Sequence, residues 1–63
     1  MNRKLWLIRL KEGDCVILYD GSESDVVKIT TKDVLNNRIW FEDGRSVRCS
    51  TGECKNRRIV PML

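Results

Sequence analysis

Arginine and tryptophan side chains that could bind a ligand alternate with apolar residues along residues 38–49. In an extended hairpin, Arg38, Trp40 and Arg48 would share one face. A guanidinium group binds phosphate or carboxylate oxygens, and an indole ring offers a surface on which a base can stack. The pattern therefore predicts a binding surface for an anionic partner.

Further arginines could extend this surface. Arg57 and Arg58 form a basic run with Lys55. They would continue a stripe that follows phosphates if the last strand lies beside residues 38–49; otherwise they form a solvated terminal face. The set predicted to bind is Arg38, Trp40, Arg45, Arg48, Arg57 and Arg58.

The two tryptophans have different expected roles. A tryptophan in a small chain often belongs to the core, because it buries a large apolar area. We expect this for Trp6. Ile39 and Phe41 are expected on the inner face of their strand, so the alternation places Trp40 on the outer face. Trp40 is therefore either a binding-surface residue or, if the register differs, a second core residue.

Catalytic residues are not evident. The chain has no histidine, which excludes Ser-His-Asp and Cys-His pairs. The four glycines are isolated, so no glycine-rich phosphate loop is present. The carboxylates that could form an acid–base pair all fall in predicted turns. They are Asp20, Glu23, Asp25, Glu42 and Asp43. We expect a protein that is not an enzyme.

The three cysteines predict free thiols. A structural zinc site uses four ligands, usually with short-spaced cysteine pairs, and Cys15, Cys49 and Cys54 do not supply them. A Cys49–Cys54 bridge would close geometrically across the intervening loop. We favour reduced thiols, with Cys15 and Cys49 as small core residues, and we expect neither a metal nor a cofactor.

Composition is typical of a small globular domain. The chain has 63 residues, 41% hydrophobic and 33% charged, with a net charge of +3. This length predicts one domain, residues 1–63, of marginal stability. Basic residues interrupt the first apolar run, and no stretch approaches the roughly 20 apolar residues of a membrane span, so we expect a cytoplasmic protein without a signal peptide.

Short apolar runs separated by turn residues predict strands. Residues 5–10 fit a strand or a short helix, and we expect a strand. Residues 15–19 and 26–31 are β-branched strands, and residues 59–60 precede Pro61 as an edge strand. The predicted fold is all-β, a single small SH3-like barrel or a strongly bent antiparallel sheet of five or six short strands.

The hairpin within residues 38–49 has two candidate registers. A two-residue loop, Asp43-Gly44, would mix core and solvent residues on both faces. A three-residue loop, Glu42-Asp43-Gly44, places Ile39 opposite Val47 and separates apolar from polar side chains, which is the register that a buried face selects. We therefore expect the three-residue loop. The predicted core consists of Val16, Leu18, Val27, Ile29, Ile39, Phe41 and Val47.

Several short motifs resemble known barrels. Gly13-Asp14-x-Val16 followed by Val26-Val27-x-Ile29 is similar to the start of SH3-like barrels of the KOW and Tudor kind, although Glu23-Ser24-Asp25 stands where the KOW pattern has a glycine. The later motifs resemble small phage-encoded barrel proteins; they are Val27-x-Ile29-Thr30, Ile39-x-Phe41, Gly44-Arg45-x-Val47-Arg48 and Ser50-Thr51-Gly52-Glu53. The resemblance implies a phage accessory protein acting in the host cytoplasm and supplies no functional residues.

Two functions follow as expectations. The first is a non-enzymatic basic module that binds nucleic acid through the Arg38, Trp40 and Arg48 face. The alternative is a phage inhibitor that binds and blocks a host protein, either an acidic one through the same face or a neutral one through an exposed apolar edge. An open barrel edge also allows a homodimer.

Overall fold

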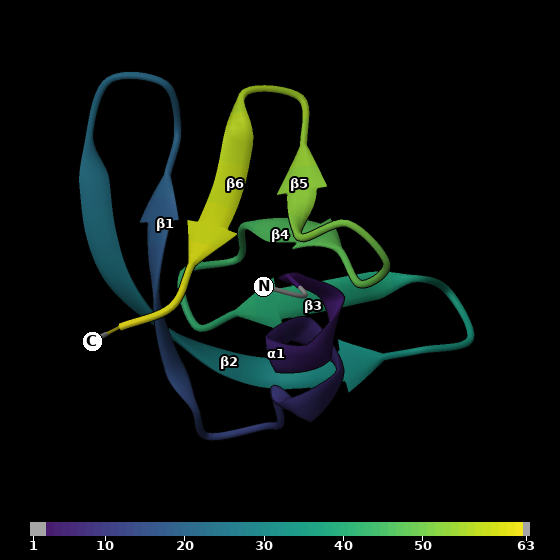
Figure 1. Ribbon diagram of the computed structural model, residues 1–63. Coiled ribbons are helices and arrows are strands. Elements are labelled where there is room, and N and C mark those ends of the chain that lie inside the picture. Colours follow the sequence, from purple (N-terminus) through teal and green to yellow (C-terminus); the bar gives the residue numbers. More distant parts are fainter. Residues whose placement is uncertain (1–2, 63) are drawn as a thin grey trace.

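Six antiparallel strands curl into a nearly closed barrel, with one short helix packed beside it (Figure 1). The structure is a computed structural model and describes residues 3–62. The strand order is β4-β3-β2-β1-β6-β5, and the two edge strands, β4 and β5, contact each other. The elements are α1 (Arg3–Arg9), β1 (Cys15–Tyr19), β2 (Ser24–Asp33), β3 (Arg38–Phe41), β4 (Ser46–Arg48), β5 (Glu53–Cys54) and β6 (Arg57–Val60). The predicted all-β barrel is confirmed.

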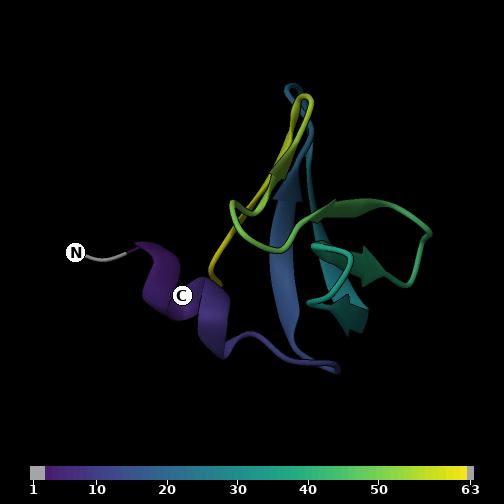
Figure 2. The same cartoon turned by 90° about the vertical axis from the view of Figure 1, so that its right-hand side faces the viewer.

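The long strand β2 connects the two halves of the barrel. Its first half pairs with β1 and its second half pairs with β3, and the register shifts between Ile29 and Thr31. A bulge of this kind bends a strand and increases its twist. The bend carries the β3–β4 hairpin away from β1, as Figure 2 shows, and lets β4 approach β5.

The core lies inside this curl. All seven residues that the alternation placed in the core are buried. The structure adds Leu7, Cys54 and Ile59 to them, while Trp6 is partly buried against the cluster. The alternating pattern identified the core strands because each has one buried face.

The N-terminal segment is a helix, so the predicted strand at residues 5–10 is wrong. Leu7 is the buried residue of α1, and its side chain completes the core. The Lys32 ammonium group donates hydrogen bonds to the carbonyl oxygens of Ile8 and Leu10, at 2.8 Å each, and to that of Leu7 at 3.4 Å. A cation at a helix C-terminus satisfies carbonyls that have no partner within the helix. This contact from β2 stabilises a helix too short to be stable alone.

The Thr-Gly loop provides the space into which α1 packs. Gly52 has a φ of +74°, and a Cβ atom there would lie 3.0 Å from Leu7 Cδ2 and 3.1 Å from Ile59 Cγ1. A side chain would therefore push the helix and β6 apart. Within residues 3–62, no helix has the length and apolar character needed to cross a membrane.

Candidate functional site: an arginine–tryptophan face

The β3–β4 hairpin has the expected three-residue loop. Arg38 pairs with Arg48, Ile39 with Val47 and Trp40 with Ser46. Gly44 has a φ of +91°, and its N–H donates to the Phe41 carbonyl at 3.0 Å, closing the turn. This register turns Ile39 and Val47 into the core and places two arginines opposite each other on the outer face.

Three arginines converge on one buried thiol. Arg38 Nη1 donates a hydrogen bond to Cys54 Sγ at 3.4 Å. Arg48 and Arg57 lie near enough for their charges to act on the same sulfur atom. The hydrogen bond from Arg38, together with these positive charges, lowers the pKa of the Cys54 thiol, and the opposing effect of desolvation is smaller.

Arg57 reaches this position because the β5–β6 hairpin contacts β4. Its Nη1 donates to the carbonyl oxygen of Ser46 at 3.4 Å. The sequence predicted a continuous stripe only if the last strand lay beside the hairpin. β6 pairs with β1 and β5, but the closure of the barrel still brings Arg57 to β4.

The three converging arginines carry no carboxylate partner among the side chains that the structure describes, where every ion pair belongs to Arg45. Like charges close together raise the free energy of the folded state. A bound anion would remove this cost. Of the three, Arg57 alone lines a neighbouring cavity of about 270 Å³, whose other lining residues are Asp20, Arg45, Cys54, Lys55 and Asn56.

Trp40 follows Arg38 by two residues on β3 and lies on the same outer face of that strand. It retains 42% of its exposed area, so it is not a core residue, and its role in binding stays a prediction. Its backbone is fixed by a hydrogen bond from Thr30 Oγ1 to the Trp40 carbonyl at 3.3 Å, and its cross-strand neighbour Ser46 is buried. Arg38, Arg48, Arg57 and Trp40 are called the arginine–tryptophan site below.

Arg45 has a different setting. Its guanidinium group pairs with Asp43 at 2.6 Å, with Asp25 at 3.1 Å and with Asp20 at 4.0 Å. The hydrogen bond between the Arg45 guanidinium group and the Asp43 carboxylate is the main cause of two pKa shifts. It raises the pKa of Arg45 and lowers the pKa of Asp43. Arg45 thus joins the β1–β2 turn to the β3–β4 turn, and we leave it out of the arginine–tryptophan site.

Arg58 belongs to another surface. It lies over the ring of Tyr19, with its guanidinium carbon 5.4 Å from the ring centre, a cation–π contact. Tyr19 is its cross-strand neighbour on β1. Since Arg57 and Arg58 are adjacent on β6, they point to opposite faces, and Arg57 alone turns towards the site.

The cysteines are all free thiols, in three different environments. Cys54 is buried, Cys49 is partly buried against the core, and Cys15 is exposed. The prediction that Cys15 is a core residue is therefore wrong, because Val16 and Leu18 hold the inner face of β1. Among the residues described, no three histidine, cysteine or acidic side chains gather where they could hold a metal.

Comparison of the chain with protein-family models, with curated proteins and with solved structures gave no match. The predicted likeness to SH3-like and phage-encoded barrels stays a prediction. The functional interpretation therefore depends on the geometry described above.

Proposed function

We propose that this chain is a small non-enzymatic module that binds single-stranded nucleic acid through the arginine–tryptophan site. The observations that support the proposal are the convergence of Arg38, Arg48 and Arg57 on Cys54 and the exposure of Trp40, which shares the outer face of β3 with Arg38. The resemblance to phage-encoded barrels supports an accessory role in a phage cycle.

The chemistry of the site favours nucleic acid over a simple anion. Arginines attract phosphates, and each phosphate contact displaces a counterion. A neighbouring aromatic ring adds base stacking, worth about 1–3 kcal/mol per base. Inorganic phosphate would use the arginines but gain nothing from Trp40.

A single strand suits the site better than a duplex. Stacking on Trp40 requires an unpaired base. Reading a B-form major groove usually requires a helix or a two-stranded ribbon inserted into it. The one helix within the described residues has seven residues, with Leu7 buried in the core, and the β3–β4 hairpin is no separate ribbon because β3 also pairs with β2.

The test is fluorescence anisotropy with a labelled single-stranded oligonucleotide and the duplex of the same sequence. We expect tighter binding of the single strand, and weaker binding after Trp40→Ala, Arg48→Ala or Arg57→Ala. Arg58→Ala removes an arginine from the same strand as Arg57 and serves as the matched control. Equal losses for Arg57→Ala and Arg58→Ala, or full affinity in Trp40→Ala, would contradict the proposal.

A further inference from the structure

One nucleophilic side chain, the thiol of Cys54, lies within the group of arginines that the proposed function uses. Its sulfur atom accepts the hydrogen bond from Arg38 Nη1 at 3.4 Å, and Cys54 is the cross-strand partner of Arg57. Side chains of directly paired residues in an antiparallel ladder project to the same side, so Arg57 extends on the side of the thiol. We call Cys54, Arg38 and Arg57 the thiol–arginine cluster.

A cavity gives small molecules access to this cluster. Cys54 keeps only 9% of its exposed area, but it lines the cavity of about 270 Å³ together with Arg57. That space is many times what one water molecule needs, so a molecule as small as hydrogen peroxide fits beside the sulfur. Lys55 and Arg57 form no ion pair among the described side chains, and the carboxylate in the lining, Asp20, lies 4.0 Å from Arg45.

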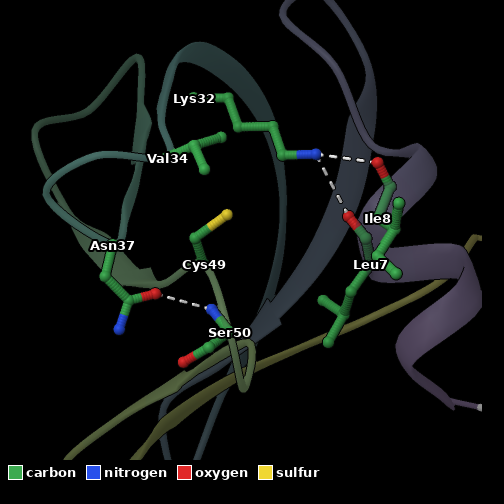
Figure 3. Close-up of a pocket in the computed structure, with 7 residues that line it drawn as sticks. All are labelled: Leu7, Ile8, Lys32, Val34, Asn37, Cys49 and Ser50. Atoms are coloured by element: carbon green, nitrogen blue, oxygen red, sulfur yellow. Dashed lines mark hydrogen bonds between the residues drawn. The ribbon is translucent and has the colours of Figure 1, made fainter.

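The other two thiols have different surroundings. Cys15 is exposed on β1, and Cys49 lines an open groove of about 460 Å³ beside α1 (Figure 3). No arginine lines that groove, and the cation in its lining, Lys32, donates to carbonyl oxygens of the helix. Among the described residues, Cys54 is the one thiol that accepts a hydrogen bond from a guanidinium group.

Neighbouring cations favour the thiolate, which is the reactive form of a cysteine. The hydrogen bond from Arg38, with the charges of Arg48 and Arg57, lowers the pKa of the Cys54 thiol. When a hydroperoxide is the oxidant, the thiolate sulfur attacks one oxygen, an S–O bond forms and the O–O bond breaks. The hydroxide that leaves takes up the proton of the transferred oxygen. Sulfur is thus oxidised to a sulfenate, and hydrogen peroxide is reduced to water.

We propose that Cys54 is an oxidation site for hydroperoxides, and that its sulfenate closes the arginine–tryptophan site to phosphate. This regulation rests on the proposed function. The sulfenate oxygen is a strong acceptor, so it holds the guanidinium groups of Arg38 and Arg57 by charge-assisted hydrogen bonds and adds a negative charge that repels phosphate. A dithiol reductant returns the thiolate, with the oxygen released as water and the reductant oxidised to its disulfide.

The test of reactivity compares two variants that each keep one of these two thiols. Cys15→Ser, Cys49→Ser keeps Cys54, and Cys49→Ser, Cys54→Ser keeps Cys15. Each folded variant is treated with hydrogen peroxide, and mass spectrometry with dimedone, which reacts with sulfenates, follows the rate of oxidation. We expect Cys54 to react faster than Cys15 although it is less exposed. Arg38→Met should slow the reaction of Cys54 about threefold or more, because less of the thiol is ionised.

The test of regulation is fluorescence anisotropy with a labelled single-stranded oligonucleotide, before and after peroxide. Oxidation should weaken binding about tenfold or more in the variant that keeps Cys54, because a charge-assisted phosphate contact is lost. Dithiothreitol should restore the affinity. The variant that keeps Cys15 should bind equally well before and after treatment.

The outcomes separate this regulation from the proposed function. If the reduced protein does not bind the oligonucleotide, both are contradicted. If the reduced protein binds and oxidation of Cys54 leaves the affinity unchanged, the regulation alone is overturned. It is also overturned if Cys54 reacts no faster than Cys15, or if oxidation abolishes the β-sheet signal in circular dichroism, since binding would then be lost through unfolding.

Discussion

Arg38 and Arg48 lie directly opposite each other across the β3–β4 ladder, although a chain of this size has little stability to spare. Arg38 is fixed by its hydrogen bond to Cys54, whereas Arg48 is exposed. The pair therefore combines one guanidinium group fixed by a hydrogen bond, that of Arg38, with one that is exposed to solvent, that of Arg48. Such an arrangement is what we expect if the pair binds an anion.

The first prediction concerns the contribution of Arg48 to stability. Removing an exposed charge that faces a like charge should leave the free energy of unfolding unchanged within about 0.5 kcal/mol, or raise it slightly. Urea unfolding of Arg48→Ala and wild type measures this difference. A loss well above 1 kcal/mol would mean that Arg48 is a structural residue.

The second prediction concerns the Cys54 thiol. The hydrogen bond from Arg38 is the main cause of its lowered pKa, so Arg38→Met should move that pKa back up towards the ordinary value. The thiolate absorbance of Cys54 can be titrated in a Cys15→Ser, Cys49→Ser background. Arg58→Met should leave the titration unchanged, and the same titration curve in Arg38→Met and wild type would refute the assigned contact.

The third prediction concerns acid stability and Arg45. Asp43 has its pKa lowered, chiefly by hydrogen bonds from Arg45. A group with a depressed folded pKa stabilises the protein above its unfolded value, here 3.8, and this contribution is lost as pH falls through the folded value. Arg45→Met should thus lower the melting temperature at neutral pH, and the difference should close as pH drops below 3.8. A difference that stays constant with pH would show that Arg45 acts through packing alone.

The fourth prediction concerns the attachment of α1. Lys32→Met removes a cation that binds three helix carbonyls, and hydrogen bonds to charged groups contribute about 1.5–3 kcal/mol. We expect a loss of about 2 kcal/mol and faster amide hydrogen exchange in α1. Lys28→Met, an exposed lysine on the same strand, is the control. Equal stability of the two variants would contradict the role given to Lys32.

The hairpin and the core were predictable because their signals are local. Asp43-Gly44 specifies the turn, and the alternation around Ile39 and Phe41 selects the register. The exposed position of Trp40 follows from the same alternation.

The helix and the centre of the site were not predictable, because they depend on residues far apart in the sequence. Lys32 stabilises the end of α1, and the apolar run of residues 5–10 does not reveal this contact. Cys54 was singled out only as a thiol. Its position among the arginines results from barrel closure, which places the β5–β6 hairpin against β4. The aspartates that bind Arg45 likewise come from separate segments that the fold brings together: Asp20 from the β1–β2 turn, Asp25 from β2 and Asp43 from the β3–β4 turn.

The most direct test of the central claim is the salt dependence of binding to a single-stranded oligonucleotide. Three phosphate contacts predict that the logarithm of the association constant falls with the logarithm of salt concentration with a slope of about −2. Arg57→Ala should reduce the magnitude of that slope by about 0.7, and Arg58→Ala should leave it unchanged. A slope near zero, or the same change in both variants, would contradict the claim that Arg38, Arg48 and Arg57 bind phosphates.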